Sequence, residues 1–459
     1  MTNRRRLVRL AFSTSCLTAI LWPAANAWAQ SPSEALATAY QSNPRLMAER
    51  ARVRSVDEGV PQALSGWRPT VVFNGSTGLQ SFTNETAAGS TSDTINPTNV
   101  ALTIDQPLYR GGQTVASTEA AEARVLAARS QLGDVEQGVM LDAAIAYMNV
   151  VRDQSVVELN INNEQVLGRR LEATRDRFQV GEVTRTDVAQ AEARLSDASA
   201  LRVAAQGDLE TSRANFEQIV GFPPEKLEFP DPSFIPPLPD SGELANAVAL
   251  AENPALLANQ YLEQAALHDI DVAVADLLPD LSLQGQLTKA YEPNSFFDES
   301  DSAQILANLR IPLYQSGAEY SRVRELREVA VQRRREVDQT RREVIENSTS
   351  AWESLVSTRA AIEALDSSVR ANEIALEGVQ QEAAVGARTT LDVLDAEQEA
   401  FDARVNLVRA RRDEVVASLT LLAAIGRLSA EYLRLPVDIY DPAQHYQNVR
   451  EKWIGFGSE

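Results

Sequence analysis

VGEVTRTDV at residues 180–188 returns 205 residues later as VGARTTLDV at residues 385–393. Further short matches keep the same offset: PLY at 107–109 and 312–314, AE at 191–192 and 396–397, and glycines at 112/317 and 221/426. A solenoid repeats about every 20 to 50 residues, so an offset of this size indicates a different architecture. The sequence therefore predicts a duplicated half-protein, with two copies of one structural hairpin.

Each half is predicted to place a pair of alternating strands before a long, proline-free helical segment. The expected first repeat covers 30–220, with helices 33–64, 113–178 and 183–220 and strands 69–80 and 99–107. The expected second repeat covers 243–426, with strands 279–288 and 303–312 and helices 317–383 and 388–426. A Pro-rich linker over 221–242 and a C-terminal segment over 427–459 complete the chain. The Gly/Ser/Thr/Asn-rich stretch from Thr83 to Thr98 is expected to be a polar loop.

The helical segments are too long for an ordinary globular domain. The 66 residues from Gln113 to Phe178 contain no proline, and such a helix is about 100 Å long at about 1.5 Å per residue. The segments 33–64 and 183–220 together have 70 residues, which is close to the 66 residues of the long helix. Two short helices stacked end to end could therefore run antiparallel to one long helix. Gly181 and Gly386 would then lie at the tips where the chain reverses. A seven-residue spacing, typical of a left-handed supercoil, runs through Val323, Ala330, Val337, Val344, Ala351, Thr358 and Leu365.

The four predicted strands require more than one chain if they lie in a membrane. Alternating stretches of about ten residues suit tilted membrane strands, and a bilayer leaves no sheet edge unpaired. Known membrane barrels have about eight strands or more, so four strands cannot close alone. Three chains would supply three times four, or twelve. A four-stranded sheet packed under the helices, outside a membrane, is the alternative that these residues leave open.

The amino-acid composition and the N-terminal segment limit where the protein can be located and which partners it can bind. Acidic residues outnumber basic ones by 64 to 43, which argues against nucleic acid as a partner because phosphate binding needs a basic surface. Residues 1–29 have the arginines, short apolar stretch and AWA site of a secretory signal peptide, an N-terminal anchor helix being the alternative. The single cysteine, Cys16, lies in that segment, so the exported chain has no disulfide. No other run is long and apolar enough for a transmembrane helix.

The residues offer no catalytic constellation. The two histidines, His268 and His445, lack a ligand spacing, and the chain has neither a Gly-rich phosphate loop nor a Gly-x-Ser-x-Gly elbow. We expect no catalytic residue, no cofactor and no metal site. Two functions remain open: a passive export duct, or a trimeric coiled-coil structural or adhesive surface protein. The duplicated strand pairs and reversing tips favour the duct, because an adhesin needs no helical hairpin.

Several paired motifs resemble the TolC family of outer-membrane efflux proteins over about residues 33–430. They are SNP at 42–44 and ENP at 252–254, WRP at 67–69 and LP at 278–279, PLYRGG at 107–112 and PLYQSG at 312–317, the two Val-Gly tips, and RTTLDVLDA at 388–396. The resemblance implies a mainly α fold with a membrane β-barrel, in a homotrimer. Its 12-stranded barrel would lie in outer-membrane lipid and continue as an antiparallel coiled-coil α-helical tunnel across the periplasm.

The same resemblance implies a function and partners. The duct would conduct substrates passively to the exterior, in a tripartite efflux pump or a type I secretion system. A periplasmic adaptor (membrane fusion) protein and an inner-membrane transporter of the RND, ABC or MFS type would dock to the tunnel tip. The cargo is not revealed, because a duct takes its specificity from the transporter.

The resemblance also assigns residues at the tips. Asp187 matches the acidic residue of a charged link that holds the family's tunnel closed, and Arg388 matches its basic partner. The tyrosine of that network would fall at Ala383 and is missing. Asp392 and Asp395 match a pair that forms an acidic, cation-binding ring around the mouth, although Asp392 alone could be a helix N-terminal acid. Val180, Gly181, Val385 and Gly386 match the adaptor-docking grooves.

Overall fold

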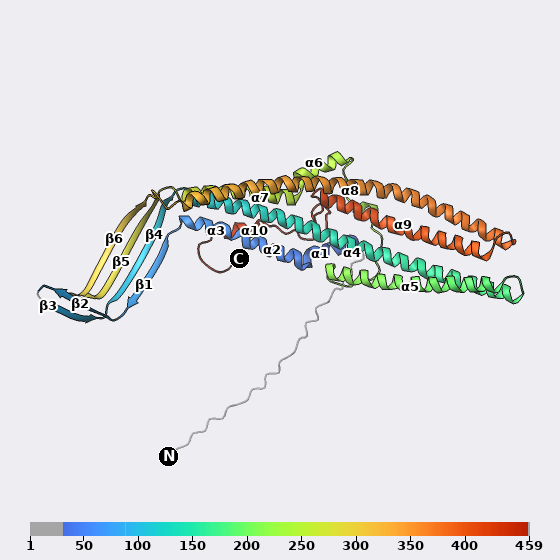
Figure 1. The fold of residues 1–459 in the computed structure, drawn as a ribbon, viewed down its shortest axis with the longest axis horizontal. Helices are drawn as coiled ribbons and strands as arrows, with labels where there is room; N and C mark the ends of the chain where they lie inside the picture. Colours follow the sequence, from blue (N-terminus) through green and yellow to red (C-terminus); the bar gives the residue numbers. More distant parts are fainter. Residues whose placement is uncertain (1–30, 88, 458–459) are drawn as a thin grey trace, which may run out of the picture.

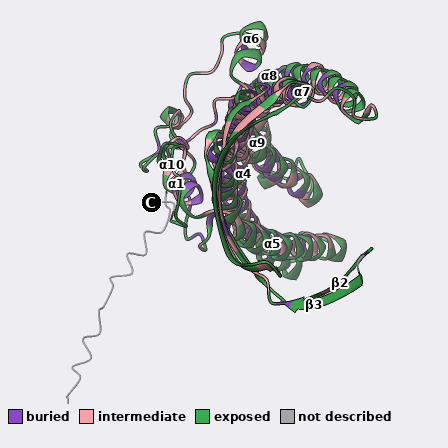
Figure 2. Cartoon of the chain, turned by 90° about the vertical axis from the view of Figure 1, so that its left-hand side faces the viewer, coloured by how far each residue is buried: buried purple, intermediate pink, exposed green. Residues whose placement is uncertain are grey.

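The computed structural model describes residues 31–87 and 89–457 as a long helical shaft with a β-sheet at one end (Figure 1). Seen along the shaft, the chain forms an open arc (Figure 2). The predicted signal peptide, residues 1–29, lies outside the described residues. Among the helices of the described chain, none combines the length and hydropathy needed to cross a bilayer.

Two long helices run through the shaft, α4 (Gln113–Gln179) and α8 (Ala318–Ala384). Each follows a glycine in the left-handed region, Gly112 with φ 85° and Gly317 with φ 84°. The helices α5 (Arg185–Val220) and α9 (Thr390–Ala424) return from the tips beside them. Of the seven-residue series in α8, the first five members are buried, whereas Thr358 and Leu365 are only half-buried.

The expected continuous helix over 33–64 is wrong. The structure has α1 (Pro32–Ser42), α2 (Pro44–Asp57) and α3 (Gly59–Leu64), followed by a 3-10 turn η1 (Ser65–Trp67). Asn43 is extended, with φ −64° and ψ 123°, because a residue before proline avoids the helical region. The second repeat breaks at the same place, at Asn253 between α6 (Gly242–Glu252) and α7 (Pro254–Ala275).

One sheet carries the strands of both repeats in the order β1-β4-β5-β6. The strands are β1 (Thr70–Thr77), β4 (Thr98–Arg110), β5 (Asp280–Asn294) and β6 (Phe297–Arg310), all antiparallel to their neighbours. The polar loop expected over 83–98 is wrong, since this region forms a hairpin of β2 (Gln80–Thr86) and β3 (Gly89–Ile95). Its threonines favour the strand conformation, and hydroxyl contacts such as Thr83 Oγ1 to Ser92 Oγ at 3.4 Å cross the hairpin.

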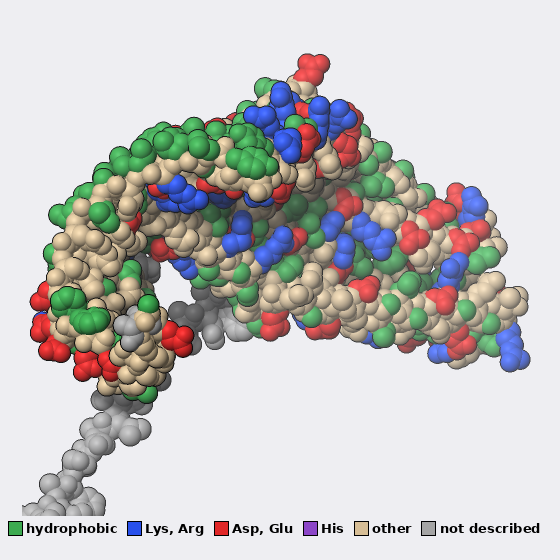
Figure 3. Space-filling model, turned by 60° about the vertical axis from the view of Figure 1, so that its left-hand side comes forward, with side chains coloured by type: hydrophobic (Ala, Val, Ile, Leu, Met, Phe, Trp, Pro, Cys, Tyr) green, Lys and Arg blue, Asp and Glu red, His purple; other side chains and the backbone are tan. Residues whose placement is uncertain are grey.

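The register of the sheet separates an apolar face from a polar one. Phe73, Leu102, Leu287 and Ala303 form one cross-strand row, and Val72, Thr103, Gln286 and Gln304 form a row on the opposite face. The apolar face is open: the exposed fraction is 70% for Phe73 and 56% for Leu287. Figure 3 shows hydrophobic side chains gathered over the outer surface of the arched sheet.

The main core lies in the middle of the shaft, where the two repeats meet. Tyr147 and Phe216 are fully buried there, with ring centroids 6.4 Å apart. The Tyr147 hydroxyl donates to the Glu228 carbonyl at 2.8 Å, and burial raises the pKa of Tyr147 to about 12. The Pro-rich linker, with the 3-10 turn η2 (Pro232–Phe234), and the C-terminal segment, with α10 (Gln444–Val449), pack against this region.

Candidate functional site

The two helical hairpins end in similar turns at the end of the shaft opposite the sheet (Figure 1). Gly181 and Gly386 adopt φ values of 81° and 78°, which L-residues with a Cβ rarely adopt. One residue later, the Glu182 N–H donates to the Arg177 carbonyl at 2.9 Å, and the second tip has the same bond. These bonds close each long helix in a Schellman-type cap, so the glycines fix where the chain reverses.

Asp187 and Asp392, both assigned to the gate, stabilise the starts of the returning helices. Each is the third residue of its helix and completes a capping box with the threonine that precedes the helix. The Asp187 Oδ2 accepts from the Thr184 N–H at 2.7 Å, and the Asp392 Oδ2 accepts from the Thr389 N–H at 2.9 Å. The Thr389 N–H lowers the pKa of Asp392 below its ordinary value, with the Thr389 hydroxyl and Arg388 adding to the effect.

Asp187 and Arg388 line one cleft of about 500 Å³ between the two tips. Within the described chain they form no ion pair with each other. The Arg388 Nε instead donates to the Glu382 Oε2 at 2.8 Å, and Glu382 raises the pKa of Arg388. Ala383 lines the same cleft, so no aromatic hydroxyl bridges the two groups.

Two other ion pairs join the hairpins, and sequence reasoning missed both. The Arg194 Nη2 of α5 donates to the Asp395 Oδ1 of α9 at 2.6 Å. The Arg170 Nε of α4 donates to the Glu397 Oε1 of α9 at 2.8 Å. The Glu397 side chain is only 4% exposed, whereas both side chains of the Arg194 pair are at least one-third exposed. Asp395 is therefore already neutralised within its own chain.

The internal repeat contained a signal for the Arg170–Glu397 pair. Glu397 is the repeat equivalent of Glu192, and Gln380 is the equivalent of Arg175. In the first copy, Arg175 pairs with Glu192 inside one hairpin. In the second copy, glutamine has replaced that arginine, and Arg170 of the other hairpin supplies the charge instead.

The residues assigned to adaptor docking are exposed to solvent at the tips. The exposed fractions of the Val180 and Val385 side chains are 72% and 82%. Neither adjacent glycine, Gly181 or Gly386, has an atom within 4 Å of where a Cβ would stand. Each tip therefore presents a valine beside open backbone.

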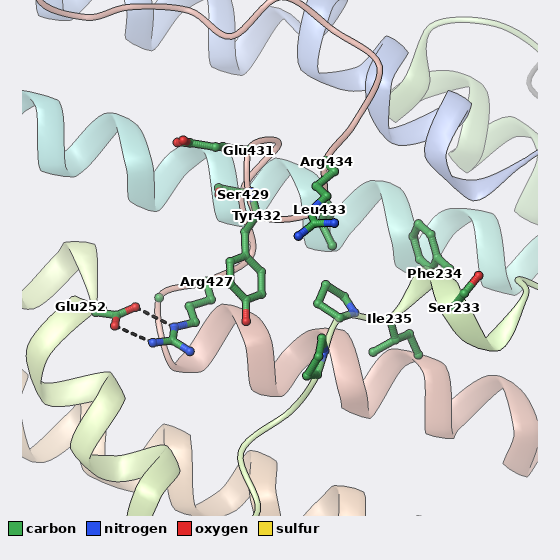
Figure 4. A pocket seen from close by; sticks show the side chains of 13 residues that line it. Ser233, Phe234, Ile235, Glu252, Arg427, Ser429, Glu431, Tyr432, Leu433 and Arg434 are labelled. Atoms are coloured by element: carbon green, nitrogen blue, oxygen red, sulfur yellow. Dashed lines mark hydrogen bonds and ion pairs between the residues drawn. The ribbon is translucent and has the colours of Figure 1, made fainter.

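A second cavity, of about 730 Å³, lies where the Pro-rich linker passes the end of α9 (Figure 4). Both nitrogens of the Arg427 fork donate to Glu252, at 2.7 and 2.6 Å, and this pairing lowers the pKa of Glu252. Gly426 has φ 88°, and a Cβ there would lie 2.6 Å from the Glu252 carbonyl oxygen. Through the Arg427–Glu252 pair, this cavity forms a junction that holds the end of α9 against the α6–α7 turn.

Among the described residues, no group of three or more His, Cys, Asp or Glu side chains is placed to hold a metal ion.

Comparisons with known proteins agree over nearly the whole chain. The family model described as "Outer membrane efflux protein" matches residues 35–222 and 247–427. Outer membrane efflux protein BepC of Brucella suis is 37% identical over 424 residues, covering 92% of this chain and 91% of that protein. Outer membrane protein TolC of Vibrio cholerae is 28% identical over 411 residues, covering 88% of this chain and 92% of that protein.

A solved structure of CusC, described as forming a transmembrane channel, matches with a TM-score of 0.78. It covers 87% of this chain and 92% of that chain, at 16% sequence identity. At that identity the match establishes the fold alone.

Proposed function

The chain belongs to the outer membrane efflux protein family, and on that premise we propose that three copies of it close one duct through the outer membrane. The protein is an outer-membrane exit channel of the kind used in efflux and type I secretion. Members of this family are channel proteins rather than enzymes. Substrates would pass from an inner-membrane transporter across the periplasm and the outer membrane to the exterior.

The observation that carries the trimer is the open, two-faced sheet. β1 and β6 are edge strands, and the apolar face between them is exposed, as Phe73 and Ile305 illustrate at 70% and 79%. In lipid each unpaired backbone group costs several kcal/mol, so both edges need partners. Pairing the β6 edge of one copy with the β1 edge of the next gives a 12-stranded barrel, with the polar face inside.

The helical tips are the proposed site of docking and gating. Each tip offers an exposed valine and accessible glycine backbone to a periplasmic adaptor, at Val180 and Gly181 and at Val385 and Gly386. A transporter of the RND, ABC or MFS type in the inner membrane would lie beneath that adaptor. Asp187 and Arg388 share one cleft without bonding within the chain. Their mutual link, if they hold the gate, is therefore made between neighbouring copies.

Asp392 and Asp395 are the proposed acidic ring at the mouth. On one helix turn they occupy positions i and i+3 and share a face. Asp395 is paired with Arg194, whereas Asp392 forms no ion pair within the described residues and is capped by Thr389 instead. Three copies of Asp392 would attract cations at a narrow pore.

Counting the copies tests the proposed assembly. Native mass measurement of the full protein extracted from outer membranes should give three chains per particle. Cysteines placed on the β1 and β6 edges should cross-link neighbouring chains, whereas cysteines on the central strands β4 and β5 should not. A monomer, or cross-links confined to one chain, would refute the barrel.

A further inference from the structure

The C-terminal segment is held firmly on the shaft through α10. The Val449 side chain is buried, at 1% exposure. The His445 Nδ1 lies 3.2 Å from the Asp57 Oδ2 of α2, and the Arg450 Nη2 donates to the Glu122 Oε1 of α4 at 3.2 Å. These contacts fix the position of whatever follows Arg450.

Beyond α10, the chain reaches the base of the sheet. The Arg68 Nη1 donates to the Lys452 carbonyl at 2.8 Å, and its guanidinium lies 5.0 Å from the centre of the Trp453 ring. Arg68 is two residues before Thr70, where β1 begins. The Lys452 ammonium also contacts the Gly457 carbonyl, which closes residues 452–457 into a loop beside Arg68.

This loop, called here the tail loop (residues 452–457), exposes three large apolar side chains. The exposed fractions are 65% for Trp453 and 90% for Ile454, and Phe456 is fully exposed. Isolated exposed apolar residues are ordinary, but three within four positions form a patch of the sort that marks a binding surface.

The patch lies at the level where a membrane would end. Trp67, Tyr109 and Tyr314 are exposed at the shaft end of the sheet, at 42%, 47% and 81%. Tryptophan and tyrosine are enriched at membrane–water interfaces, where one end of the ring is wet and the other apolar. Arg68, the chain neighbour of Trp67, holds Trp453 at this end of the sheet. α10, which carries the tail loop, lies on the convex side of the arc (Figure 2), the side of the apolar sheet face.

We propose that the tail loop is an interfacial membrane anchor, in which Trp453, Ile454 and Phe456 enter the inner, phospholipid leaflet of the outer membrane. The anchor rests on the proposed function, because it requires the sheet to be embedded in lipid. Its occupant is the headgroup–acyl boundary of that leaflet, argued from continuity with the aromatic residues at the strand bases. Charge agrees with this position, since Arg68 and Lys452 border the patch and cations suit a lipid headgroup layer.

Fluorescence quenching by brominated phosphatidylcholine tests the anchor. In the full protein carrying Trp67→Phe and Trp352→Phe, Trp453 is the sole tryptophan after residue 29. After reconstitution into vesicles, Trp453 should lose most of its emission when bromines lie near the headgroups. It should lose less when they lie near the acyl-chain ends, and iodide in the water should quench it weakly.

Two matched variants separate failure of the anchor from failure of the duct. Trp352 of α8, kept as the sole tryptophan, should be insensitive to brominated lipid. Phe73→Trp in a tryptophan-free chain reports on the sheet and should be quenched by deep bromines. Quenching of Phe73→Trp without quenching of Trp453 overturns the anchor and leaves the duct standing. Trp453 shielded from both lipid and iodide means that a protein covers it, which also overturns the anchor. No quenching of either probe refutes the embedded sheet and the anchor together.

A second readout avoids any change at Trp453. The chain has one cysteine, Cys16 in the predicted leader, so a nitroxide on Phe456→Cys is unique in the exported chain. Its relaxation should respond to oxygen dissolved in lipid more than to an aqueous nickel complex. The opposite order would contradict insertion.

Discussion

At the scale of single residues, the two copies of the repeat differ most where their charges meet. Glu192 is exposed and pairs within its hairpin, whereas its equivalent Glu397 is buried and pairs across hairpins. One Glu397 oxygen, Oε2, has no hydrogen-bond partner in the described chain. A buried carboxylate with a single strong partner depends on that partner, so Arg170 contributes more than Arg194 to holding the two hairpins together.

Replacing Arg170 by alanine should therefore destabilise the tip. Removing one partner of a buried pair costs about 3–5 kcal/mol because the other charge stays buried; since Arg170 is 40% exposed, we expect the lower end of that range. Arg175→Ala is the matched control on the same helix, because the Arg175–Glu192 pair is more than half exposed on both sides and should contribute under about 1 kcal/mol. Thermal unfolding of the protein in detergent, followed by helical circular dichroism, measures both. Equal shifts in Tm would contradict the assignment.

Asp392 supports a prediction about pH. Its pKa is lowered in the folded protein, so its stabilising contribution is complete above the unfolded value near 3.8 and is lost only as the pH falls through the lower folded value. The proposed ring should therefore keep its charge at mildly acid pH, and block of the channel by trivalent cations should persist there.

Thr389→Ala removes a hydroxyl that donates to the Asp392 carboxylate and should move the loss of block to higher pH. Thr184→Ala, which removes the matching cap in the first repeat, should leave the midpoint of block unchanged. The pH dependence of the block, measured in planar bilayers, tests this prediction. Equal midpoint pH values in both variants would exclude Asp392 from the mouth.

At the scale of helices and strands, hydrophobic periodicity predicted the long helices to within one or two residues at their ends, and it placed the four main strands. It missed the β2–β3 hairpin because Ser, Thr and Gly read as loop, while the cross-strand hydroxyl contacts that support it depend on register. It missed the break at Asn43 although Pro44 follows, because a residue before proline is only biased away from a helix. The gate residues came from resemblance, and no periodicity could show that Arg194 and Arg170 reach α9.

The junction between α9 and the α6–α7 turn should be sensitive to one methyl group. Gly426→Ala combines a positive φ with a Cβ 2.6 Å from the Glu252 carbonyl oxygen. The first effect costs about 1–2 kcal/mol, and the overlap adds about 1–3 kcal/mol. Gly317→Ala is the control, since its φ is 84° and nothing lies within 4 Å of the added Cβ. The Tm of Gly426→Ala should fall further than that of Gly317→Ala. Equal shifts would contradict a tightly packed junction, because they would mean that the atoms around Gly426 accommodate the added methyl group.

The two faces of the sheet should respond oppositely to charge. Leu287 lies on the apolar face, and its chain neighbour Gln286 lies on the polar face. An arginine facing lipid near the bilayer midplane costs about 2–4 kcal/mol, so Leu287→Arg should reduce the amount of assembled protein in outer membranes. Gln286→Arg should assemble normally and shift ion preference towards anions. Loss of assembly in both variants, or in neither, would contradict the assigned faces.

At the scale of the whole molecule, one chain is an incomplete object. Its arc is open in Figure 2. Within the described residues, the sheet has two unpaired edges and nothing covers its apolar face. The long helices set the length of the shaft, and the duplicated hairpins bring both tips to the same end (Figure 1). The proposed closed ring of copies would satisfy all three deficits at once and create a continuous interior from tip to sheet.

Single-channel recording from the purified full protein in planar bilayers tests that interior most directly. A closed duct gated at its tips predicts small, cation-selective unit conductance, and a larger unit conductance when Arg170→Ala removes the buried ion pair between the two hairpins. Inserted protein that conducts no ions in either form would contradict the account.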